Sequence, residues 1–142
     1  LLRGGRLVDP SCGLDSVGDL LLRDGTVSAL GQSLPVPHDA LVIDATGLVV
    51  APAFVDVHAH LRDPGFSEKE TLETGAAAAA AGGFAVVCCM PNTEPPLDTP
   101  ERVRALVERA RELPVRVFPI GAISRERRGE ELADLAGMAE AG

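Results

Sequence analysis

Four polar residues alternate with apolar ones through one short segment of this 142-residue chain. Asp56, His58, His60 and Arg62 lie two residues apart, and valine, alanine and leucine fill the positions between them. Side chains on a β-strand alternate between its faces, so a strand here places all four polar groups on one face. Two neighbouring imidazoles suit the ligation of one metal ion. The segment therefore predicts a strand whose polar face binds a metal and an anionic ligand, since buried polar groups need such partners.

A simpler interpretation exists for the histidines. A His-x-His triplet taken alone is more often a surface pair or a hydrogen-bonded core pair than a pair of metal ligands. Asp56 before the triplet, Arg62 after it and the strand spacing favour the metal site. His38 stands alone in a proline-containing loop, where we expect it to be solvated.

The composition is that of an ordinary globular protein and argues against several functions. Hydrophobic residues make up 46% and charged residues 24% of the chain, and the net charge of −8 disfavours nucleic-acid binding, which needs a basic face. No apolar run approaches the roughly 20 residues of a transmembrane helix, so no membrane role is expected. Cys12, Cys88 and Cys89 do not form a disulfide framework, and we expect reduced thiols in a cytoplasmic protein.

Two parts of different pattern meet near residue 51. Residues 1–51 contain short β-like segments separated by turns, and Asp24-Gly25 is the signal of a tight hairpin. A second pair of segments, 41–44 and 48–50, flanks another turn. This part is predicted to be a small β domain of the sandwich type.

Residues 52–142 alternate strands with helices, a pattern typical of βαβ units and a parallel sheet. The expected strands are 53–58, 84–90 and 115–122, and the expected helices are 69–81, 99–112 and 130–141. Three such units begin either a doubly wound sheet or a (β/α)8 barrel. In a barrel, functional groups lie where strands end, and His58, His60, Arg62 and Asn92 fall there. A barrel needs about 250 residues, so we expect a chain truncated after the first three β/α units.

The segment from Asp56 to Gly65 resembles the first signature of the dihydroorotases, a family of the amidohydrolase superfamily. Three further segments agree with this resemblance in their order along the chain. They are 3–10, 70–75 and 82–93. The resemblance implies the metal-dependent hydrolase barrel of that superfamily, preceded by a small β domain.

The resemblance also implies roles for the matching residues. His58 and His60 would be ligands of a divalent metal, usually Zn²⁺, with one or two ions in a complete subunit. Arg62 and Asn92 would bind the substrate carboxylate, and the planar fork of arginine suits this role. Without the resemblance, Asn92 is more simply a turn residue of its Pro-Asn-Thr loop. Asp56 would orient a histidine.

The activity implied is the reversible, metal-dependent hydrolysis of (S)-dihydroorotate to N-carbamoyl-L-aspartate in pyrimidine biosynthesis. In relatives, the bridging ligand, the later histidine ligands and the catalytic aspartate follow the third unit. No residue of this chain is therefore expected to be catalytic, and the 142 residues alone are expected to be inactive.

Two alternatives stay open. One is another cyclic amidohydrolase, an allantoinase or dihydropyrimidinase, although Arg62 favours a substrate with a free carboxylate. The other is a non-catalytic subunit that scaffolds aspartate transcarbamoylase, although the presence of both His58 and His60 argues against it. The resemblance is also compatible with a homodimer and with association with aspartate transcarbamoylase.

Overall fold

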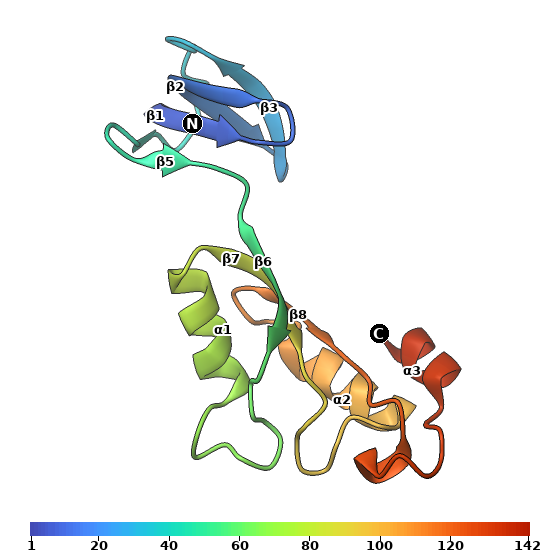
Figure 1. Cartoon of the computed structure of the whole chain (residues 1–142). Helices are drawn as coiled ribbons and strands as arrows, with labels where there is room; N and C mark the ends of the chain where they lie inside the picture. Colours follow the sequence, from blue (N-terminus) through green and yellow to red (C-terminus); the bar gives the residue numbers. More distant parts are fainter. The chain divides into compact units, whose positions relative to one another are not determined.

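The computed structural model describes residues 1–142, which form two compact units, Leu1–Pro52 and Ala53–Gly142 (Figure 1). The expected domain boundary after residue 51 lies next to this division. No helix in either unit has the length and apolar character needed to cross a membrane.

The first unit is a single five-stranded sheet. Its strands are β1 (Leu2–Asp9), β2 (Leu14–Arg23), β3 (Thr26–Gly31), β4 (Ile43–Asp44) and β5 (Val49–Val50). The strand order is β3-β2-β1-β4, and β5 also pairs with β1. Asp24 and Gly25 connect β2 to β3 with φ angles of 50° and 74°, the left-handed pair that a two-residue hairpin turn requires. The predicted hairpin is confirmed.

The second pair of segments in this unit does not form a hairpin. Both β4 and β5 pair with β1, and both run parallel to it. The Leu48 N–H group bonds the Ala45 carbonyl at 2.9 Å, and Gly47 has a φ angle of 78°, so the turn displaces the chain without reversing it. Because β4 and β5 extend an edge of the existing sheet, these residues build one sheet with both antiparallel and parallel pairs.

The second unit alternates strands and helices, as predicted. Its elements are β6 (Phe54–Ala59), α1 (Leu72–Ala81), β7 (Phe84–Cys89), α2 (Pro100–Ala110), β8 (Arg116–Pro119), the 3-10 turn η1 (Arg125–Arg127) and α3 (Leu135–Ala141). The strands form a parallel sheet in the order β6-β7-β8. Three β/α units are therefore present. Their strands form an open sheet and do not close into a barrel.

Capping residues set where the helices begin. Helix α1 starts at Leu72 instead of the expected residue 69, because Thr71 and Thr74 form a reciprocal capping box. Helix α2 follows Thr99 as its N-cap, as predicted. Helix α3 is shorter than expected, since the Asp134 carboxylate accepts the Gly137 N–H group at 2.9 Å and caps the helix there.

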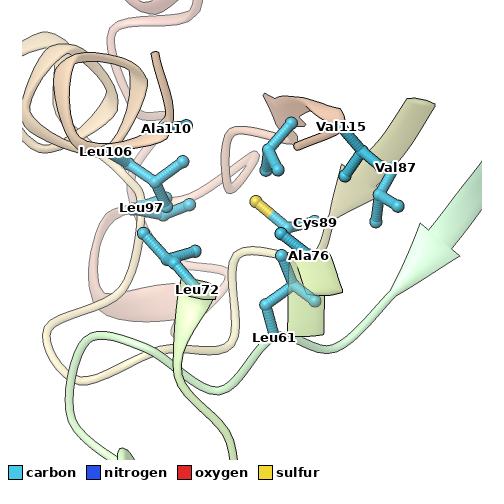
Figure 2. Packing of buried hydrophobic residues seen from close by; sticks show 10 residues of the cluster. Leu61, Leu72, Ala76, Val87, Cys89, Leu97, Leu106, Ala110 and Val115 are labelled. Carbon is cyan, nitrogen blue, oxygen red and sulfur yellow. The ribbon is translucent and has the colours of Figure 1, made fainter. Parts of the chain in front are cut away.

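The apolar core of the second unit lies between the sheet and the first two helices. Leu72 of α1 is fully buried, and Cys89 of β7 lies among the helix side chains (Figure 2). The buried members of this cluster are Leu61, Leu72, Ala76, Val87, Cys89, Leu97, Leu106, Ala110, Val115 and Val117. Burial raises the pKa of the Cys89 thiol to about 11, so this cysteine is an inert core residue, consistent with the reduced state expected for it.

The outward face of β6 is only partly covered. Ala59 and Leu61 pack against the core, as expected for the apolar face of this segment. Val55 and Val57 on the same face are 57% and 69% exposed. The first half of this face is therefore left uncovered, since neither Val55 nor Val57 belongs to the core cluster.

Candidate active site

Three loops gather at one end of the parallel sheet in the second unit. They follow the carboxyl ends of β6, β7 and β8 and lie at the lower end of this unit in Figure 1. The Glu94 N–H group donates to the Pro64 carbonyl at 2.9 Å and joins the first two loops. The Glu126 N–H group donates to Asp98 at 2.6 Å and joins the second loop to the third. This is the end of the sheet at which parallel α/β folds carry their sites.

The two histidines of the predicted metal site lie at the end of β6. His58 belongs to the strand and His60 follows it directly, and both are exposed. Their ring centroids are 5.2 Å apart, with the rings edge to face. The Asp56 carboxylate accepts the backbone N–H group of His58 at 2.9 Å. Asp56 therefore holds the backbone of a histidine in this structure, and not the imidazole that we expected it to orient.

His60 is connected to Asn92 across the two loops. The His60 Nδ1 atom lies 2.8 Å from the Asn92 Oδ1 atom. An amide oxygen only accepts hydrogen bonds, so this contact places a proton on Nδ1, and in the neutral imidazole the lone pair then lies on Nε2. Metal-binding histidines have this arrangement, with one ring nitrogen hydrogen-bonded and the other free to bind the metal. His60 thus fits the role of a metal ligand.

The histidines form only part of a metal site. No group of three or more histidine, cysteine or acidic residues able to hold a metal ion is present in residues 1–142. Catalytic zinc is held by three protein ligands. His58 and His60 fit two of these positions, and a complete site needs further ligands.

Arg62 and Asn92 line one cavity of about 260 Å³ between the loops. The other residues that line this cavity are Phe66, Thr93, Glu94, Pro96, Glu126 and Arg127. Arg62 is half-buried, and its φ angle of 63° turns the chain out of the strand direction. It forms no ion pair, so its guanidinium group is free to bind an anion. The structure thus brings the predicted pair Arg62 and Asn92 together and connects it to His60.

An ion pair between a buried carboxylate and an exposed arginine fixes the loop that carries Arg62. Asp63 is 5% exposed and accepts two hydrogen bonds from Arg109 of α2, at 2.8 and 3.1 Å. It also accepts the Leu72 N–H group at 3.4 Å. The Arg109 hydrogen bonds hold the pKa of the Asp63 carboxyl below its usual value. The residue next to Arg62 is thereby tied to a helix 46 positions later in the sequence.

A second buried carboxylate, Asp98, holds the other two loops. Asp98 is 3% exposed and is paired with Arg102 of α2. Its other carboxylate oxygen accepts the Glu126 N–H group of the third loop. Arg102 and Arg109 are seven residues apart, about two helical turns, and so project from the same side of α2. One helix therefore braces all three loops.

These bracing residues were not predicted from the sequence. The only local signal is the seven-residue spacing of Arg102 and Arg109, which leaves their partners undetermined. The partners lie on loops whose positions depend on the whole α/β arrangement.

The sequence model of one protein family, described as dihydro-orotase-like, matches residues 47–142. The chain belongs to this family. Dihydroorotases of Citrifermentans bemidjiense and Solibacter usitatus are each 48% identical to it over 143 residues, covering 100% of this chain and 34% and 33% of those proteins. The dihydroorotase of Aquifex aeolicus is 41% identical over 100% of this chain and 34% of its own length. The dihydro-orotase-like chain thus spans about a third of the length of these relatives.

Solved structures of cyclic-amide hydrolases share this fold. An L-hydantoinase (dihydropyrimidinase) from Arthrobacter aurescens matches with a TM-score of 0.75 and 29% identity, over 87% of this chain and 27% of that one. A D-hydantoinase matches with a TM-score of 0.72 and 27% identity, over 98% of this chain and 28% of that one. The α/β fold of this dihydro-orotase-like chain therefore resembles the N-terminal part of hydantoinases.

Proposed function

We propose that this chain forms part of a dihydroorotase that reversibly hydrolyses (S)-dihydroorotate to N-carbamoyl-L-aspartate in pyrimidine biosynthesis. The observation that carries the proposal is the hydrogen bond between His60 and Asn92 beside the cavity that Arg62 also lines. This hydrogen bond joins His60, the proposed metal ligand, to Asn92, the proposed ligand of the substrate carboxylate. In dihydroorotate the carboxylate lies close to the amide that is hydrolysed, so the two groups must be neighbours in the site. The dihydroorotases that are 48% identical to the whole chain support the same activity.

The side chains of the site have distinct roles in this proposal. His58 and His60 would hold one or two Zn²⁺ ions together with later ligands. The chemistry that zinc would supply there is polarisation of the amide carbonyl and a lower pKa of water at the site. Arg62 donates paired hydrogen bonds to the substrate carboxylate. Asn92 donates to the same carboxylate through its NH₂ group, because its oxygen is already occupied by His60.

The complete protein is proposed to be a (β/α)8 barrel. The sheet described here has two open edges, β6 and β8, and its edge residues Val57 and Phe118 are 69% and 44% exposed. Closure by further strands and helices would cover such surfaces. The remaining metal ligands and the general acid/base would come from later strand ends. Residues 1–142 alone are accordingly predicted to be inactive.

The hydantoinase fold supports a second candidate, another cyclic-amide hydrolase without a carboxylate on its substrate. The test uses the protein that contains this chain at the full length of its relatives, termed the full-length protein. We expect kcat/KM for dihydroorotate to exceed that for hydantoin, dihydrouracil and allantoin. In Arg62→Gln, dihydroorotate turnover should fall by about 10²-fold or more, as for loss of a charged substrate contact. A preference for a neutral ring would instead support the second candidate.

Metal content separates both enzymes from the non-catalytic scaffold. The full-length protein should contain zinc by elemental analysis, and a His58→Ala, His60→Ala double variant should have lost it. His38→Ala is the matched control, because His38 belongs to the first unit, whereas every proposed site residue belongs to the second. Full-length protein without zinc would favour the scaffold.

A further inference from the structure

A second arginine, Arg127, lines the cavity that contains Arg62 and Asn92. It belongs to η1 in the loop after β8 and is exposed. Like Arg62, it forms no ion pair with any carboxylate of the chain. Two unpaired guanidinium groups from different loops therefore border the same space.

The loop that carries Arg127 adopts an unfavourable backbone conformation. Glu126 and Arg127 have φ angles of 51° and 58°, in the left-handed region that residues with a side chain rarely adopt. Such conformations persist where surrounding contacts determine them, and they concentrate at functional sites. Here the Glu126 N–H group donates to the buried Asp98 at 2.6 Å, and the Arg127 N–H group donates to the Ser124 carbonyl at 3.1 Å. The fold thus holds Arg127 at the cavity.

The cavity is lined by two cationic and two acidic residues. The cations are Arg62 and Arg127, and the acidic residues are Glu94 and Glu126. Arg102 lies 3.7 Å from the Glu126 carboxylate but is also paired with the buried Asp98, so it balances only one of these two carboxylates. Neither Arg62 nor Arg127 is paired with a glutamate of the cavity, so both guanidinium groups are available to an anion. The chain as a whole has a net charge of −8, which repels anions at long range. A local pair of cations at the cavity counters this repulsion and attracts a carboxylate to the site.

We infer that Arg127 is a second cation for the substrate carboxylate and that it determines the substrate affinity together with Arg62. Asp98 holds the loop of Arg127 in place through the Glu126 N–H group. This inference rests on the proposed function for the identity of the ligand. It assigns a specificity role to the loop after β8, which the sequence showed only as a charged segment. Arg127 acts in binding and attraction, and takes no part in the proton transfers.

Steady-state kinetics of the full-length protein test the role. In Arg127→Gln, we expect KM for dihydroorotate to rise about three- to tenfold with little change in kcat, as for loss of an exposed charged contact. The dependence of kcat/KM on salt concentration should weaken as well, because a steering charge is lost. Arg127→Lys should recover most of the loss. Arg128→Gln is the matched control, since Arg128 is exposed on the same loop but does not line this cavity.

Calorimetric binding separates this inference from the proposed activity. Orotate carries a ring carboxylate and uracil does not, so the wild-type protein should bind orotate more tightly than uracil. Arg127→Gln should reduce that preference several-fold even if the protein turns over no dihydroorotate. An unchanged preference in Arg127→Gln, an absent preference in the wild type, or an equal effect in Arg128→Gln would overturn the inference. Failure of turnover alone would overturn only the proposed activity.

Discussion

The contact between the first two loops of the site provides a sharp test at Gly65. Gly65 has a φ angle of 102°, and a Cβ atom built there would lie 2.8 Å from the Cα atom of Glu94 and closer still to its carbonyl oxygen. Backbone atoms cannot move aside as a flexible side chain can. Gly65→Ala therefore strains its own backbone and pushes the loops after β6 and β7 apart.

The expected loss has two parts. An alanine at positive φ costs about 1–2 kcal/mol, and overpacking in a tight contact adds about 1–3 kcal/mol. The free energy of unfolding should thus fall by about 2–5 kcal/mol. Gly13→Ala is the matched control, because Gly13 has a φ angle of 71° with no atom within 4 Å of an added Cβ. It pays only the backbone part, about 1–2 kcal/mol.

Urea denaturation and kinetics of the full-length protein measure both effects. Separation of the loops moves Arg62 away from Asn92, and a displacement of about 1 Å can cost up to about 10²-fold in rate. We expect kcat/KM for dihydroorotate to fall at least about tenfold in Gly65→Ala and to stay unchanged in Gly13→Ala. Equal stability and equal kcat/KM in the two variants would refute the loop contact.

Three further predictions concern the core and its charges. Leu72→Ala should lower the unfolding free energy by about 2–5 kcal/mol in urea denaturation, because Leu72 is 0% exposed, and a loss below about 1 kcal/mol would contradict its packing. Asp63 has a lowered pKa through Arg109, so its ionised form stabilises the fold above the unfolded-state value of roughly 3.9, and this stabilisation is lost as the pH falls through the lower folded-state pKa. The stability difference between wild type and Asp63→Asn should therefore be largest at neutral pH and shrink in acid, and a difference independent of pH would count against the ion pair. A maleimide at neutral pH should label the exposed Cys12 in the native protein and reach Cys89 only after unfolding, whereas rapid native labelling of Cys89 would show that this thiol is accessible.

Local sequence patterns predicted the parts of this molecule that depend on neighbours in the chain. The alternation around His58 predicted β6, and Thr99 with Pro100 predicted the start of α2. The strand ends at Ala59, and Arg62 has a φ angle of 63°, so the strand spacing did not determine where Arg62 lies. Its place near Asn92 followed from the position of both residues after strand ends and from the family resemblance, and not from periodicity.

Features that depend on distant residues were not predictable in this way. The pairing of β4 and β5 with β1 joins segments about 40 residues apart, and a turn between two short strands looks the same whether or not it reverses the chain. The ion pair between Asp63 and Arg109 spans 46 residues, and no spacing rule connects them. The roles of His58, His60, Arg62 and Asn92 toward metal and substrate stay predictions.

The bracing of three loops by α2 has a consequence for protein engineering. Loops at the ends of barrel strands are commonly treated as exchangeable modules that carry specificity. The loop after β6 is not such a module, because its buried Asp63 requires Arg109 on another element. A graft of this loop into a scaffold without that arginine would leave a buried carboxylate unpaired, which is strongly destabilising. The smallest transferable part is the loop together with the part of α2 that carries Arg109.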